Sequence, residues 1–151
     1  MKIEQVIKQR RPFRNAWQKS IINLIYTSNW VTDRIKQLLK PYGITLQQYN
    51  VLRILRGAGE PISTSVIRER LLDKMADTSR MVDRLYQKGL VDRRVCPNDK
   101  RLVDISLSDK GRELVEELEH INAKLDSITG NLSEEEAHLL SELLDKIREE
   151  K

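Results

Sequence analysis

Several residue types are scarce in this 151-residue chain, and each scarcity excludes a class of protein. Cys96 is the one cysteine, so no disulfide can form within the chain and a disulfide-stabilised fold is excluded. Aromatic residues make up only 5% of the chain. No apolar run approaches the roughly 20 residues that a membrane-spanning helix needs, so such a helix is not expected. The first residues are polar and basic, unlike a signal peptide. We therefore expect a cytoplasmic protein with no membrane partner.

Histidine is scarce too, which bears on metal binding and catalysis. His120 and His138 are the two histidines, and no Asp, Glu or Cys cluster surrounds them at the spacing of metal ligands. No nucleophile with a nearby base, no glycine-rich phosphate loop and no pair of acids stands out. The sequence therefore predicts a protein that is not an enzyme, with no metal site, no cofactor and no catalytic residues.

Charge is present but unevenly spread. The net charge is +4, yet residues 1–61 carry 11 Lys/Arg against 3 Asp/Glu, and residues 62–110 carry 11 against 8. Residues 111–151 carry 5 against 12. The first two-thirds of the chain could therefore meet a polyanion, whereas the last third could not.

The first strong pattern is an amphipathic helix at about residues 15–39. Apolar residues recur there every three or four positions, which is the period of one helix face. Pro41 and Gly43 are expected to end this helix. The apolar face comprises Ile21, Leu24, Ile25, Val31, Ile35, Leu38 and Leu39.

Three shorter helices are expected next. Thr45 and Gln48 have the spacing of a capping box, which marks the start of a helix. Two more helices are predicted at about residues 64–72 and 77–88, and Gly89 is the expected stop of the second.

After Gly89 the spacing of the apolar residues changes to the two-residue alternation of β-strands. Residues 91–95 and 102–107 alternate partially, and the Cys-Pro-Asn-Asp-Lys-Arg segment at 96–101 has the composition of a turn. We expect a two-stranded hairpin with a basic turn, and no other β structure in the chain.

The remainder of the chain is predicted to be helical. Gly130 divides it, and Ser133 with Glu136 forms a second capping box that starts the last helix. The sequence thus predicts a mainly α protein of six helices with one small β-hairpin. The helix before Gly130 has a heptad-like seam of Leu114, Leu118, Ile121, Leu125 and Ile128.

Two short helices followed by a charged hairpin are typical of a winged helix-turn-helix. In that fold one helix enters the major groove of DNA and the hairpin, or wing, reaches the neighbouring minor groove or backbone. Here the sequence resembles the MarR family, in helix order over about residues 15–150 and most specifically at the wing. The wing motif of the family begins with Arg, which is followed after four residues by Asp. A second Arg follows after one more residue, and Leu-Thr follows that Arg after five. The matching residues are Arg94, Asp99, Arg101, Leu107 and Ser108, with Ser in place of Thr.

The resemblance and the helix pattern together predict which residues contact DNA. Hydroxyls near a helix start can contact phosphates or base edges, and arginine can bind guanine bidentately. Asp99 is expected to accept hydrogen bonds from turn amides or from Arg101, and Arg101 would enter a narrow minor groove. Asp83 is also free to face DNA, although surface ion pairs with neighbouring turns are the alternative for Asp83 and Arg84. The predicted contacts are Asp77, Thr78, Ser79, Arg80 and Arg84 in the recognition helix, and Arg94, Asp99, Lys100 and Arg101 in the wing.

Two further features have two interpretations each. Cys96 is either a silent surface thiol or an oxidation-sensitive group beside basic residues. The second feature is a set of aromatic residues in and after the first helix, which is either interface core or the lining of a pocket for a small aromatic or phenolic effector. That set is Trp17, Tyr26, Trp30 and Tyr42.

The resemblance implies a homodimer held by its N- and C-terminal helices. We expect residues 1–44 to form a dimerisation helix, 45–110 the DNA-binding region and 111–151 further dimerisation helices, all in one domain. The function expected is a ligand-responsive repressor that binds a pseudo-palindromic operator in double-stranded DNA. The alternative is a winged-helix module that binds a protein and no DNA. The expected interface residues are Ile21, Leu118, Ile121, Leu125, Leu140 and Leu144.

Overall fold

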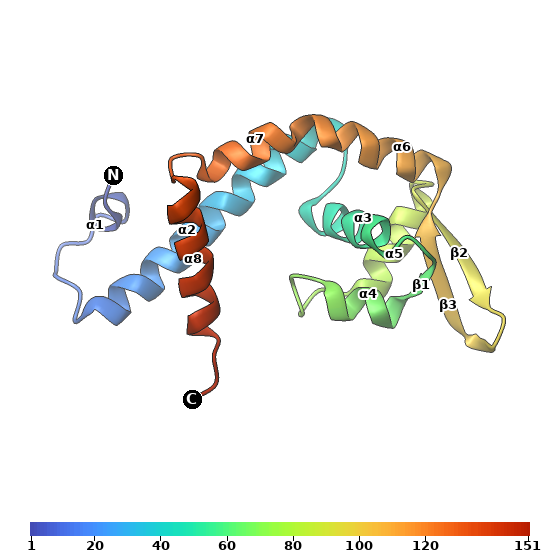
Figure 1. The fold of residues 1–151 in the computed structure, drawn as a ribbon, viewed down its shortest axis with the longest axis horizontal. Coiled ribbons are helices and arrows are strands. Elements are labelled where there is room, and N and C mark those ends of the chain that lie inside the picture. Colours follow the sequence, from blue (N-terminus) through green and yellow to red (C-terminus); the bar gives the residue numbers. More distant parts are fainter.

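The long helix α2 (Ala16–Leu39) runs from the side of the molecule where the N-terminus lies to its upper middle (Figure 1). Helices α6 (Asp109–Leu118) and α7 (Asn122–Asp126) form the upper edge in that view, and α7 contacts α2. The short helices and the strands lie at one end, and α8 (Glu134–Ile147) lies at the other. The structure is a computed structural model that describes the backbone of residues 1–151 and every side chain except those of Cys96, Lys100 and Arg101.

Helix α2 has the ends that its sequence predicts. The side chain of Asn15 accepts a 2.9 Å hydrogen bond from the Gln18 amide and so satisfies one of the free donors at the helix start. The helix passes into a 3-10 turn, η1 (Lys40–Tyr42), and Gly43 leaves that turn with a φ of +70°. The predicted helix is therefore confirmed. A short helix before it, α1 (Ile3–Val6), was not predicted.

Three capped helices follow: α3 (Leu46–Ala58), α4 (Thr64–Arg70) and α5 (Thr78–Gln87). In each, an oxygen of the capping side chain accepts a hydrogen bond from a backbone amide in the first turn, which fixes where the helix begins. Helices α4 and α5 contact each other and form the helix-turn-helix. The capping residues are Thr45, Ser63 and Asp77.

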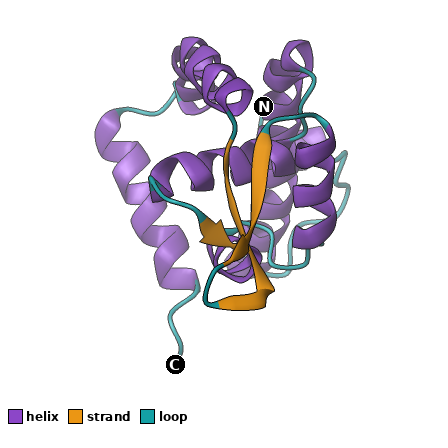
Figure 2. Ribbon diagram, turned by 90° about the vertical axis from the view of Figure 1, so that its right-hand side faces the viewer, coloured by secondary structure: helices purple, strands orange, loops and turns teal.

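The sheet has three antiparallel strands in the order β1-β3-β2, and the long hairpin extends beyond the helices (Figure 2). Strands β2 (Val91–Cys96) and β3 (Asp99–Leu107) form the predicted hairpin. The expectation of no other β structure is wrong, because β1 (Ile62–Ser63) pairs with β3. Two residues are too few to show the alternation by which a strand is recognised in a sequence.

The base of the wing is closely packed against α6. A side chain at Gly111 is excluded, because an added Cβ would lie 2.0 Å from the carbonyl oxygen of Leu90. Ser108 caps α6 and also donates from its hydroxyl to the Gly89 carbonyl at 2.6 Å. The end of the recognition helix, the wing and α6 therefore meet at one fixed point.

The C-terminal helices differ from the prediction in one respect. The helix expected between Ser108 and Gly130 is divided into α6 and α7 by a 3-10 turn, η2 (Glu119–Ile121), and a second such turn, η3 (Ser127–Thr129), follows α7. The capping box of Ser133 starts α8 as predicted.

The hydrophobic core lies among the helix-turn-helix, the sheet and the end of α2. Its fully buried members come from elements far apart in the sequence, so the core fixes the recognition helix against its neighbours. Truncating one such side chain, Leu85→Ala, would remove about 2–5 kcal/mol from the free energy of unfolding. The largest fully buried side chains are Leu39, Leu52, Ile67, Leu85, Ile105, Val51, Val91 and Thr78.

Candidate nucleic-acid interface

Helix α5 has one buried and one exposed face. Val82 and Leu85 are buried in the core, whereas Ser79, Arg80 and Arg84 are exposed. Among the described residues, no side chain forms an ion pair with Arg80 or Arg84. These two cations are therefore available to a ligand on the outer face, and for Arg84 the alternative of an ion pair is not observed.

Two residues at the start of α5 have structural roles. Thr78 has 0% of its surface exposed, so it cannot touch DNA, and the prediction that it does so is wrong. It is the first residue of the helix, where the chain turns inward beneath the exposed Asp77. The Asp77 carboxylate accepts a 3.1 Å hydrogen bond from the Arg80 amide and caps the helix. A DNA contact by Asp77 stays a prediction.

The recognition helix is joined to the wing by an ion pair. Nη1 of Arg93, on β2, lies 2.7 Å from Oδ1 of Asp83, on α5. The same guanidinium lies over the ring of Tyr86, 3.8 Å from the ring centroid. Asp83 therefore forms a surface ion pair, but with a strand residue and not with a neighbouring turn of its own helix. Sequence reasoning did not identify Arg93, because nothing in its spacing indicates which of two adjacent arginines faces the helix.

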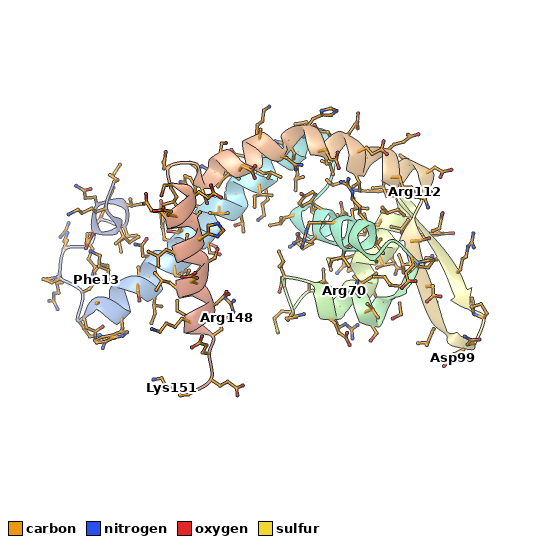
Figure 3. All side chains as sticks on the ribbon, in the orientation of Figure 1. Phe13, Arg70, Asp99, Arg112, Arg148 and Lys151 are labelled. Carbon is orange, nitrogen blue, oxygen red and sulfur yellow. The ribbon has the colours of Figure 1, made fainter. Side chains whose placement is uncertain are left out.

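The wing extends beyond the core. Arg94 is exposed on β2, and Asp99 lies at the tip of the hairpin (Figure 3). The backbone of Lys100 and Arg101 belongs to β3, but their side chains, like that of Cys96, lie outside the described residues. Their DNA contacts, and the hold of Asp99 on Arg101, stay predictions.

A cleft of about 430 Å³ separates α5 from the wing. Its lining includes Thr64, Ser79 and Arg94, together with the ion-paired Asp83 and Arg93. Hydroxyl and guanidinium groups are the donors that proteins use for phosphate oxygens. The cleft therefore has the chemistry of a site for a nucleic-acid backbone.

The four aromatic residues singled out from the sequence do not form one cluster. Tyr26 and Trp30 line a cavity of about 690 Å³ between α1 and α2. Tyr42 lines a different cavity, beside Lys88 and Lys110. Trp17 is 76% exposed and borders neither. A single pocket lined by all four is therefore excluded.

A larger cavity, of about 820 Å³, lies between α2, α3 and the C-terminal helices. Ile35, Leu46 and Ile128 form part of its apolar wall, and Lys36 and Arg53 are its cations. This cavity could not be predicted from the sequence, because its lining residues come from segments far apart in the chain.

The expected dimer interface is only partly exposed. Leu118 and Ile121 are buried in the core of the protomer, so the prediction that they face a second copy is wrong. Leu125 is partly buried against the same core, and Leu144 is half-buried. Two groups of exposed apolar side chains lie instead on the first half of α2 and along α8. They are Trp17, Ile21, Leu24, Ile25, Leu139, Leu140, Leu143 and Ile147.

No helix in the described part of the chain is both long and apolar enough to cross a membrane. Among the described residues, no three His, Cys, Asp or Glu side chains gather as metal ligands would.

Comparison with known proteins identifies the family. The model of the MarR family matches residues 44–103. The multiple antibiotic resistance protein MarR of Salmonella typhimurium is 36% identical over 128 residues, which cover 82% of this chain and 88% of that protein. The chain belongs to the MarR family. Other relatives in the family are named HTH-type transcriptional regulators, and this agrees with a regulator rather than a protein-binding module or an enzyme.

Solved structures of MarR proteins share this fold. A cysteine-to-serine mutant of MarR from E. coli, in complex with operator DNA, has a TM-score of 0.77 and 31% identity, covering 84% of this chain and 92% of that one. BpsR of Bordetella bronchiseptica, whose DNA binding is regulated by 6-hydroxynicotinic acid, has a TM-score of 0.72 and 25% identity, covering 83% and 96%. The predicted winged helix-turn-helix is confirmed.

Proposed function

We propose that this MarR-family chain is a homodimeric regulator that binds a pseudo-palindromic operator, with α5 in the major groove and the wing in the adjacent minor groove. The observation that carries the proposal is the single surface formed by α5, the cleft and the wing. Ser79 of α5 and Arg94 of β2 line the cleft, and Arg80 and Arg84 are exposed on α5. Operator DNA in the solved E. coli complex supports this assignment. Such a regulator would act in the cytoplasm.

The two-fold symmetry of an operator requires two copies of the chain. The exposed apolar side chains of α2 and α8 support a dimer, because exposed apolar patches of this kind mark protein interfaces. We assign Ile21, Leu140 and Leu144 to that interface. Residues 45–110 would then bind DNA, and the helices on either side would hold the dimer together.

We assign effector binding to the 820 Å³ cavity in place of the aromatic set. Its apolar wall could hold an aromatic ring, and Lys36 and Arg53 could bind a carboxylate or phenolate on that ring. Helix α3 lines the cavity and also contacts α5, so a ligand there could shift the recognition helix. The regulation of BpsR by a hydroxylated aromatic acid supports this class of ligand.

The decisive experiment compares the two DNA-contacting elements. Titrations should use a palindromic operator, identified by genomic binding, and a scrambled duplex, each at several salt concentrations. Arg80→Ala should lose about 1–3 kcal/mol of discrimination at particular base pairs. Arg101→Ala should weaken binding to all sequences and make the salt dependence shallower.

Three outcomes would contradict the proposal. Equal affinity of the wild-type protein for operator and scrambled DNA would mean that α5 does not read bases. Unchanged affinity and salt slope for folded Arg101→Ala would mean that the wing does not touch DNA. Absence of any DNA binding would favour the protein-interaction module instead.

A further inference from the structure

The third strand and the hydrophobic core support only the inner part of the wing. Strand β1 pairs with β3 only at Asp104 and Ile105. Ile105 is fully buried, whereas Val95 is 58% exposed and the ladder slips between Val95 and Cys96. The outer part of the hairpin therefore has no third strand and little core beneath it. A two-stranded ribbon of this kind can tilt and twist unless something else holds it.

Arg93 lies one residue inside the point where this support ends, since Asp104, the outermost β3 residue that pairs with β1, lies opposite Arg94. It pairs with Ile105 across the ladder, and its side chain reaches α5. There its guanidinium meets Asp83 at 2.7 Å and lies on the ring of Tyr86. The carboxylate fixes one edge of the planar group and the ring fixes its face, so the side chain is held in both position and orientation. Lysine can reproduce the charge but neither the planar fork nor the stacking.

Arg94, the next residue, provides an internal comparison. Successive side chains of a strand point to opposite sides, and no ion pair of Arg94 with a described residue is observed. Of these two adjacent arginines, Arg94 is thus open to a ligand, whereas Arg93 is engaged by two side chains of the recognition helix. The charge of Arg93 is therefore already compensated by Asp83 before any DNA arrives.

We propose that Arg93 is a positioning residue: through Asp83 and Tyr86 it sets the tilt of the wing relative to α5, and hence the spacing between the major-groove and minor-groove contacts. This inference rests on the proposed function, since it requires both elements to meet DNA. It assigns Asp83 and Tyr86 to holding the wing and removes Asp83 from the residues that read bases.

A positioning role predicts a loss that depends on the length of the duplex. The test uses two duplexes: a long one that includes the flanks protected by the wings in a hydroxyl-radical footprint, and a core one that ends before those flanks. For Arg93→Ala, binding to the long duplex should weaken about 5- to 20-fold, and binding to the core duplex should stay within about twofold of the wild-type value. Arg93→Lys should behave like Arg93→Ala.

The matched control is Arg112→Ala. Arg112 is an exposed arginine of α6 that pairs with Asp109 at 3.4 Å and lies away from the tip of the wing (Figure 3). The Arg112→Ala variant should bind both duplexes with the affinity of the wild type. Tyr86→Leu, which keeps the Asp83–Arg93 ion pair, should show a smaller loss confined to the long duplex, and it provides a second test if Arg93→Ala is poorly folded.

Three results would overturn the inference. Equal losses on both duplexes would show that Arg93 supports the fold or α5 in general. Full rescue by Arg93→Lys, with a shallower salt slope for Arg93→Ala, would show that Arg93 is a direct phosphate contact. Unchanged binding of both Arg93→Ala and Tyr86→Leu to the long duplex would show that the contact does not set the wing. If the wild-type protein itself binds neither duplex, the proposed function fails instead.

Discussion

Nζ of Lys88 lies 2.9 Å from Oε1 of Gln48, which joins the end of the recognition helix to the start of α3. The same ammonium donates to the Gly43 carbonyl at 2.7 Å. Gln48 is buried, and its Oε1 also accepts from the Thr45 amide. One side-chain amide therefore completes the cap of α3 and fixes the position of α5.

Replacement of Gln48 should destabilise the protein. In Gln48→Ala, the Thr45 amide loses its side-chain acceptor and Lys88 keeps only one partner, so we expect a loss of about 1–3 kcal/mol in the free energy of unfolding. Urea unfolding followed by circular dichroism measures this. Gln47→Ala, at the adjacent exposed position, is the control and should change the unfolding midpoint little. Similar midpoints for the two variants would show that the amide of Gln48 is unimportant.

Thr78 provides a test of the corrected recognition surface. Its buried hydroxyl has no hydrogen-bond partner among the described residues. Thr78→Val keeps the shape and removes the polar atom, so the stability should stay the same or rise by up to about 1 kcal/mol. Operator affinity should not change, whereas Ser79→Ala, at the exposed neighbouring position, should weaken it. A loss of affinity in a fully folded Thr78→Val would place this hydroxyl at the DNA after all.

The dimer prediction concerns the apolar face of α8. Light scattering at low micromolar concentration should give twice the 17.7 kDa of one chain. In Leu140→Asp a charge would be buried at the interface, so this variant should be monomeric and should lose operator binding. Ser141→Asp, at the exposed polar position that follows Leu140, should remain dimeric. A wild-type monomer with native helicity would contradict the assignment of α2 and α8 to an interface.

The predicted effector site involves one of two arginines on α3. Arg53 lines the 820 Å³ cavity, whereas Arg56, one turn away, is paired with Glu119. A panel of planar aromatic acids and phenols, including 6-hydroxynicotinate, should yield a ligand that weakens operator affinity, with a coupling of about 1–3 kcal/mol. Arg53→Ala should reduce its affinity in calorimetry, and Arg56→Ala should not. If no compound of the panel binds, the effector site should be abandoned.

The attachment of α1 to α2 should depend on pH. Lys19 lies 2.5 Å from Glu4, and its hydrogen bond lowers the pKa of that carboxyl below the ordinary value of 4.5. A carboxyl whose folded-state pKa is lowered stabilises the fold above its unfolded-state pKa, and this contribution is lost as pH falls through the folded-state pKa. We therefore expect the attachment of α1 to α2 to weaken as the pH falls below 4.5.

The readout is the fluorescence of Trp30, which shares a cavity with Glu4, in a Trp17→Phe background. Glu4→Gln should remove the acid transition. If the transition persists in Glu4→Gln with the same midpoint, another group is responsible for it.

Local chemistry was predictable from the sequence. Each helix start depends on a capping side chain and a nearby amide, so Thr45 and Ser133 marked helix starts correctly. The wing was predictable as well, because it combines alternation, a turn and a specific spacing of Arg94 and Asp99.

Which face of each element is covered was decided only by the tertiary structure. The seam of Leu118 and Ile121 is apolar whether it packs within a protomer or between two, and the fold buries it within one. Thr78 has the hydroxyl of a typical DNA-contacting residue, but the helix-turn-helix buries it in the protein interior. Arg93 and Arg94 are the same residue type, and the tertiary structure alone turns Arg93 towards Asp83. The periodicity of the sequence shows which residues share one face of a helix or strand. Whether that face is buried, and which side chains it pairs with, depends on the segment that packs against it.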